Sequence, residues 1–153
     1  MPLNFSDTVP AAPSGKVNVQ WQVDGDNNLS AYVDDPGGGG SAPYDVVASY
    51  TGTPGAAAVV LILTMVRAVS FAANFSGSRG TLSANPTATA TYTVKKNGAS
   101  IGTVAVSTGG VFTFATSGGA AQSFAVGDRM TVEAPSPADS TLANVGLTFA
   151  GTR

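Results

Sequence analysis

Short segments with the alternating pattern of β-strands recur between residues 44 and 153, and this feature constrains the fold more than any other. Each segment is bounded by Gly, Pro, Asn or Asp, which favour turns. Many short strands at such spacing are typical of an antiparallel β-sandwich or jelly-roll-like domain, so we expect an all-β fold. The expected strands are 44–50, 57–71, 87–96, 100–107, 111–116, 129–133 and 144–151.

The turns between these segments predict antiparallel neighbours. Asn97-Gly98 is a strong hairpin signal, because both central residues of a tight type I′ turn need positive φ. Glycine pairs at 109–110 and 118–119 mark the next two turns, and Gly127-Asp128 leads into the segment 129–133. The chain is rich in Thr, Val, Ala, Gly and Ser and contains a single Glu, a composition that favours strands over helices.

The run Val59 to Val66 differs from the other segments because it is apolar at every position except Thr64. A strand without alternation is expected to be buried on both faces. Two arrangements remain open, a central strand of the sandwich or a strand covered by another subunit. For the second arrangement, the interface candidates are Leu61, Leu63 and Met65.

Residues 1–35 are predicted to form an extended N-terminal arm followed by a β-hairpin. The prolines within residues 1–15 disfavour a helix. An alternating run at 16–23 and a second apolar run at 29–33 flank a turn-forming segment. Because a lone hairpin is marginally stable in water, we expect its apolar face, with Trp21 and Tyr32 on it, to contact a partner. The attachment candidates are Val17, Val19, Trp21, Val23, Leu29 and Tyr32.

Four consecutive glycines at 37–40 mark a boundary between modules. Gly- and Ser-rich tracts behave as flexible connectors. We therefore divide the chain into an attachment unit at 1–35, a Gly/Pro linker at 36–43 and a β-sandwich domain at 44–153.

The absence of Cys and His argues against most enzyme classes. These residues supply thiolate nucleophiles, the commonest general base and the usual transition-metal ligands. Asp128 and Asp139 are candidate acids, but catalysis by paired carboxylates needs two that converge in a cleft, and both fit turns or loops better. We expect no enzymatic activity and no cofactor.

The segment 24–28, together with Asp35, imitates part of a calcium-binding loop. However, Leu29 stands where the glycine of the sharp turn belongs, and strands are expected on both sides. A turn is the favoured interpretation, so no metal site is predicted.

Charge and hydropathy bear on partners. The net charge is -2 and the seven Lys and Arg residues are scattered, so nucleic acid is not an expected ligand. The longest apolar stretch, 56–66, is too short for a membrane-spanning helix, and the first residues lack the pattern of a signal peptide. We therefore expect synthesis as a soluble cytosolic product without membrane insertion. Five aromatic residues could stack on sugar rings, namely Trp21, Tyr32, Tyr44, Tyr50 and Tyr92.

Four segments are distinctive: RAVSFAANFSGS at 67–78, YTVKKNGASIGTV at 92–104, FAVGDRMTVEAP at 124–135 and the C-terminal segment 139–153. Together they resemble the β-rich domains of tailed-phage and prophage structural proteins. Residues 4–22 are also similar to a segment common in phage structural proteins. The likeness covers most of residues 56–153.

The resemblance implies a place in the virion, as a head decoration, cement, head-fibre, spike or tail-fibre domain made in the bacterial host. The chain lacks the Gly-X-Y repeats of fibre shafts, which favours a compact decoration or cement protein. The expected partners are further copies of the chain, with a trimer favoured, and the major capsid or another virion protein bound by residues 1–35. The alternative function is a tail-fibre module that recognises glycans on the host surface.

Overall fold

The computed structural model describes residues 19–23, 29–33 and 42–153. By their internal contacts the residues divide into two compact units, Met1–Ser41 and Ala42–Arg153. Almost all of the regular structure is antiparallel β-sheet, which confirms the all-β class predicted from the sequence. In the part of the chain that the structure describes, no helix has the length and apolar character needed to cross a membrane.

The described residues of the first unit form a hairpin, as predicted. Strand β1 (Val19–Val23) pairs antiparallel with β2 (Leu29–Val33). The register places Trp21 opposite Ala31 and Gln20 opposite Tyr32. The side chains of this hairpin lie outside the described part of the chain, so the shared apolar face of Trp21 and Tyr32 stays a prediction.

Several sequence predictions for the first unit lie outside the described residues. They concern Val17, the arm at 1–18, the calcium-like segment 24–28 with Asp35, and most of the linker at 36–43.

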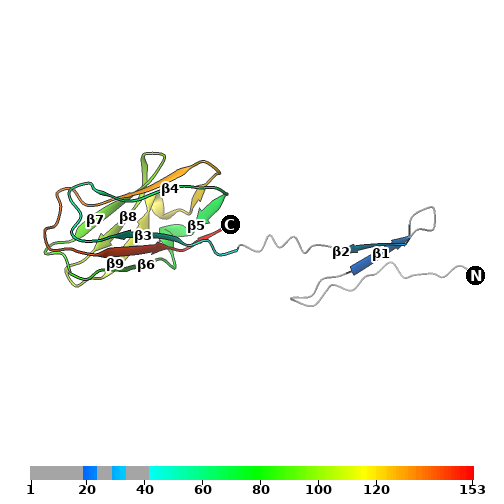
Figure 1. Ribbon diagram of the computed structural model, residues 1–153, viewed down its shortest axis with the longest axis horizontal. Coiled ribbons are helices and arrows are strands. Elements are labelled where there is room, and N and C mark those ends of the chain that lie inside the picture. Colours follow the sequence, from blue (N-terminus) through cyan, green and yellow to red (C-terminus); the bar gives the residue numbers. More distant parts are fainter. Residues whose placement is uncertain (1–18, 24–28, 34–41) are drawn as a thin grey trace, which may run out of the picture. The chain divides into compact units, whose positions relative to one another are not determined.

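One layer of the sandwich in the second unit is a five-stranded antiparallel sheet (Figure 1). Its strand order is β4 (Val59–Thr64), β11 (Arg129–Glu133), β7 (Ala90–Lys96), β8 (Ala99–Val106) and β9 (Phe112–Thr116). The β7–β8 hairpin turns at Asn97 and Gly98, whose φ values are 51° and 89°. Both are positive, as the predicted Asn-Gly hairpin turn requires.

The other layer consists of two three-stranded sheets. One has the order β3 (Val46–Tyr50), β12 (Val145–Phe149) and β6 (Arg79–Thr81), and the other β10 (Gln122–Phe124), β5 (Val69–Phe71) and β13 (Gly151–Thr152). Only Ala150 separates β12 from β13, so the end of the chain runs through both sheets. The Tyr44 N–H donates to the Gly151 carbonyl at 2.8 Å, which places the two ends of this unit side by side (Figure 1).

The core between the layers follows from the alternation that the sequence predicted. Every second residue is buried at 90–94 of β7 and at 102–106 of β8, including Tyr92, Val94, Val104 and Val106. A cluster of rings packs edge to face around Phe149, a geometry that aromatic pairs prefer. Its members are Phe71, Phe75, Phe114, Phe124 and Phe149. Phe75 comes from the short turn η1 (Ala73–Phe75), while η2 (Ser117–Gly119) connects β9 to β10.

The segment 57–71 differs from the prediction in two ways. It forms two strands in different sheets, β4 and β5, instead of one. In addition, β4 is an edge strand, and 64% of Ile62 is exposed, so the strand is not buried on both faces within one chain. Its outer face has no covering layer in the described unit, which excludes the central-strand arrangement. The arrangement with a second subunit remains a prediction.

Candidate functional site

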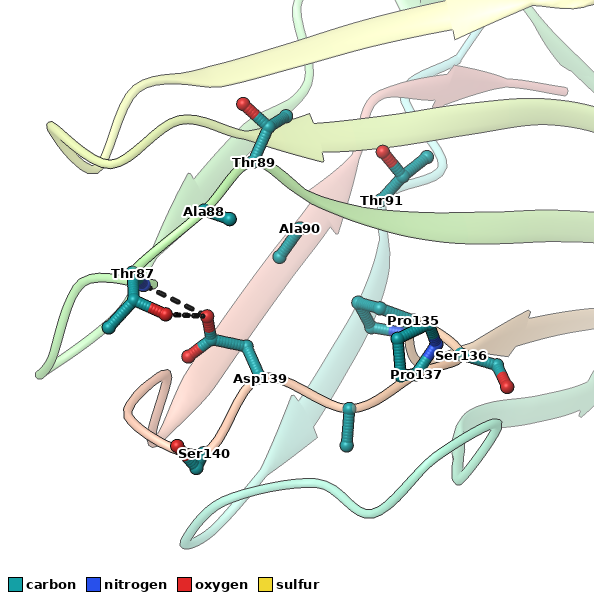
Figure 2. A pocket seen from close by; sticks show the side chains of 11 residues that line it. Thr87, Ala88, Thr89, Ala90, Thr91, Pro135, Ser136, Pro137, Asp139 and Ser140 are labelled. Atoms are coloured by element: carbon teal, nitrogen blue, oxygen red, sulfur yellow. Dashed lines mark hydrogen bonds between the residues drawn. The ribbon is translucent and has the colours of Figure 1, made fainter.

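A solvent-open hollow of about 470 Å³ lies between the start of β7 and the loop that follows β11. Residues 87–91 form one wall, and residues 135–140 form the other (Figure 2). The lining consists of hydroxyl groups, small apolar side chains, two prolines and one carboxylate, that of Asp139. Asp139 was one of the two candidate acids in the sequence.

The Asp139 carboxylate accepts hydrogen bonds on both oxygens. Oδ2 accepts from the N–H and the hydroxyl of Thr87, each at 2.9 Å, and Figure 2 shows the carboxylate turned toward that residue. Oδ1 accepts from the Thr141 hydroxyl at 2.7 Å and from the N–H groups of Thr141 and Leu142 at 2.9 Å. Asp139 thus joins two loops that are far apart in the sequence.

These hydrogen bonds also determine the protonation of Asp139. The bond from the Thr141 hydroxyl, followed by those from the Leu142 and Thr141 N–H groups, holds the pKa of this carboxyl well below its ordinary value. Hydrogen bonds to the ionised form of an acid favour that form. A carboxylate that stays ionised cannot act as a general acid near neutral pH, and no second carboxylate is among the described residues that line the hollow. The geometry fits the loop role that the sequence favoured.

Asp128, the other candidate acid, fastens a turn in a similar way. It accepts hydrogen bonds from the Asn97 amide and from the Ala125 N–H, both at 2.7 Å, and Lys96 Nζ lies 3.0 Å from Oδ2. The Asn97 bond is the main reason why the pKa of Asp128 is lowered to about 2. Lys96 Nζ also donates to the Ser123 carbonyl at 2.7 Å. These contacts tie the β7–β8 turn to the turn before β11.

Glu133, the single glutamate, pairs with Lys95 on the outer face of the five-stranded sheet, with 2.6 Å between Nζ and Oε2. Among the residues described, no group of three or more His, Cys, Asp or Glu side chains is placed to hold a metal ion. The carboxylates of Asp128, Glu133 and Asp139 therefore all take part in contacts within the β-domain.

The aromatic residues considered for sugar stacking are placed as follows. Tyr92 is fully buried, so the interpretation of this residue as a sugar platform is wrong. Burial, with a smaller contribution from the charge of Asp139, raises the pKa of Tyr92 to about 12, and its buried hydroxyl has no hydrogen-bond partner among the described residues. Tyr44 and Tyr50 are half-buried and pack against the core. The side chains of Trp21 and Tyr32 lie outside the described part.

Strand β4 carries an exposed apolar surface that the sequence prediction located only in part. Leu61 and Leu63 stand opposite the buried Val132 and Met130, so they face the core and are partly buried. Met65 is only 1% exposed and belongs to the core, which does not suit an interface residue. The exposed large apolar residues of this segment are Val59 at 51%, Ile62 at 64% and Val66 at 70%.

The two-residue period of a β-strand explains why the predicted residues face the core while Ile62 is exposed. Residues 61, 63 and 65 share one face, while residue 62 is on the other. In an unbroken apolar run, the sequence does not reveal which of the two sets points outward. The register with β11 reveals it.

Comparison of the chain with protein-family models, with curated proteins and with solved structures finds no match. The functional interpretation therefore depends on the residues themselves. The described part of the β-domain combines carboxylates engaged in loop contacts with an apolar, exposed edge strand. Such an arrangement suits contact with another protein surface.

Proposed function

We propose that the chain is a non-enzymatic structural protein of a phage virion, a capsid decoration, cement or head-fibre protein. In this proposal, residues 1–35 attach to the major capsid protein or to another virion protein, and the β-domain at 44–153 forms the homo-oligomer. The observation that carries the proposal is the exposed apolar edge of the β-domain at Val59 and Ile62. In addition, the acidic side chains of Asp128 and Asp139 take part in contacts that hold loops together.

The resemblance to phage structural proteins supports the virion assignment. Two of the resembling segments, 92–104 and 124–135, coincide with the β7–β8 hairpin and with the turn and strand of β11. These elements form the centre of the five-stranded sheet. The resemblance therefore involves the body of the domain as well as its loops.

Symmetric sites on a shell favour closed oligomers, and the resemblance to virion appendages favours a trimer. A decoration or cement protein also needs a surface for the shell. The hairpin β1–β2 supports that role, because a two-stranded hairpin gains stability when it packs on another surface.

Deletion of residues 1–35 tests the attachment proposal. Purified full-length and deleted proteins would be mixed with shells of the source phage that lack this protein, and bound copies would be measured by co-sedimentation. We expect the deletion to abolish binding while circular dichroism shows an intact β-domain. Undiminished binding of the deleted protein would contradict attachment through residues 1–35.

The alternative is a tail-fibre module that binds host glycans. It has less support, because Tyr92 is buried and the half-buried Tyr44 and Tyr50 pack on the core. A glycan array separates the two functions. Strong, selective glycan binding together with no shell binding would favour the alternative over the decoration protein.

A further inference from the structure

We propose that strand β4 is the surface through which two copies of the chain pair, antiparallel and about a two-fold axis near Leu63. The pairing would join their five-stranded sheets into one continuous sheet. This inference rests on the oligomer part of the proposed function and identifies the contact surface. It predicts two-fold pairing, whereas the resemblance favours a trimer.

The main-chain groups of β4 alternate in direction along the strand. The Met65 N–H donates to the Asp128 carbonyl and the Met65 carbonyl accepts from the Gly127 N–H, both at 2.8 Å, so Met65 points its main-chain groups toward the β11 side. Successive residues of a strand point these groups to opposite sides. Those of Ile62 and Thr64 therefore point to the outer edge, where no described strand pairs with β4.

The outer edge of β4 carries no charge and no proline at its centre. Natural proteins protect edge strands with charges, prolines, short length or covering segments. The segment Val59 to Val66 contains neither a charged residue nor a proline, and its exposed residues include the β-branched Val59 and Ile62. One bulge lies at its beginning, opposite Val132 and Glu133.

The other edges in the described β-domain differ from β4. At β9, the Asn74 amide oxygen accepts a hydrogen bond from the Thr116 N–H at 3.3 Å, so η1 covers the end of that strand. Strand β3 also exposes an apolar residue, Val47, but it is one residue shorter than β4 and directly follows the exposed Asp45. Strands β6, β10 and β13 have two or three residues each. Within residues 42–153, β4 thus offers the longest uncharged edge.

The chemistry of this edge favours a second copy as its occupant. A free main-chain edge binds another strand, and a two-fold contact requires a self-complementary surface. Like charges directly opposite each other destabilise a strand pair, and the uncharged segment 59–66 brings none together. A partner strand of the same sequence therefore meets no electrostatic penalty.

A register centred on Leu63 lets the outward main-chain groups of Ile62 and Thr64 both form hydrogen bonds with the partner strand. In this register, Ile62 and the partner's Thr64 form a hydrogen-bonded pair and exchange both main-chain hydrogen bonds. Leu63 stands beside the partner's Leu63 on the inner face. Leu61 and Leu63 are only partly buried in one chain, and the pairing would cover them further.

Sedimentation of the full-length protein tests the inference. We expect a dimer, or a larger assembly of even order, and we expect Ile62→Lys to weaken association roughly tenfold or more, because it places like charges near the two-fold axis. Since Ile62 is largely exposed in one chain, its substitution leaves folding intact, which circular dichroism would verify. The matched control is Thr113→Lys, an exposed position on the opposite edge strand β9, and it should leave association unchanged.

Hydrogen exchange provides a second readout on the same samples. The amides of Ile62 and Thr64 should be protected in the concentrated wild-type protein and exchange rapidly after dilution or in the Ile62→Lys variant. A wild-type monomer at all concentrations would overturn the inference. So would an oligomer, including a trimer, that survives Ile62→Lys while these two amides exchange rapidly. Either result leaves shell binding, the test of the proposed function, unaffected.

Discussion

The two edge strands of the five-stranded sheet, β9 and β4, end the sheet in different ways. Strand β9 is covered, because Thr116 exchanges hydrogen bonds with Asn74 of η1, and Phe112 packs against Gly80 of the opposite layer. Strand β4 has no hydrogen-bonded partner on its outer edge within residues 42–153, although β3 of the opposite layer lies near it, and it exposes Ile62. The domain therefore covers the end of β9 with hydrogen bonds of its own, whereas no described strand pairs with the outer main-chain groups of β4.

The covered side depends on close packing at Gly102, and substitution there should have the largest effect on stability. A Cβ at this position would lie 2.7 Å from the Phe75 ring and even closer to the Ala115 carbonyl. We expect Gly102→Ala to lower the free energy of unfolding by about 3 kcal/mol, the upper part of the range typical of overpacking. Urea denaturation measures the change.

Gly55→Ala is the control for that experiment, because a Cβ at Gly55 would meet no atom within 4 Å. We expect its stability to match that of the wild type within about 0.5 kcal/mol. Equal stability of the Gly102 and Gly55 variants would contradict the close packing on the β9 side.

Substitution of Asn74 should have a smaller effect on stability. It removes a hydrogen bond that covers the end of β9 and so leaves the edge of this strand without a partner, as at β4. Asn74→Gly keeps the positive φ of 54° but removes the amide oxygen that accepts from the Thr116 N–H. We expect a loss of about 1 kcal/mol, typical of one hydrogen bond, and faster exchange of the Thr116 amide. Asn144→Gly is the matched control, because this asparagine also has positive φ and accepts from the Gly52 N–H far from β9. Unchanged exchange at Thr116 in the Asn74 variant would show that η1 does not protect this edge.

Lowering the pH should weaken the charged loop contacts and lower the stability of the domain, but it should not weaken association through the uncharged edge of β4. The folded-state pKa of Asp139 is lowered, so its contribution to stability is present above the unfolded pKa of about 3.9 and is lost as the pH falls through the folded pKa. We expect the midpoint temperature of unfolding of the wild type to decrease when the pH is lowered below about 4. The midpoint temperature of Asp139→Asn should be lower than that of the wild type at neutral pH and should decrease less steeply in acid. The association constant should change little down to about pH 4, because segment 59–66 has no titratable group. Parallel acid curves for the two proteins would argue against the Asp139 contact.

Local chemistry made part of this structure predictable. The Asn97-Gly98 turn and the alternation in β7 and β8 depend on neighbours in the sequence, and the structure has both as predicted. The strands β6 and β10 were missed, because three residues are too few to show a period. The segment 57–71 was not recognised as two strands, because its apolar residues run through the break at Met65.

Features that depend on distant pairing could not be predicted. The position of β4 at an edge is set by its pairing with β11, and the outward position of Ile62 follows from that register. The contact between Asp139 and Thr87 joins residues that are 52 positions apart. The sequence pattern predicted that Asp139 lies in a loop, but it did not predict that its carboxylate binds Thr87.

A single-cysteine variant tests the β4 pairing most directly. The chain has no cysteine, so Leu63→Cys in the full-length protein can form a disulfide only with another copy. Near a two-fold axis at Leu63, the two Cα atoms would lie about 4.5 Å apart, within the range that a disulfide accepts. On a non-reducing gel after mild oxidation, we predict a covalent dimer that forms much faster than in Thr113→Cys on β9. Equal, slow crosslinking of the two variants would contradict pairing through β4.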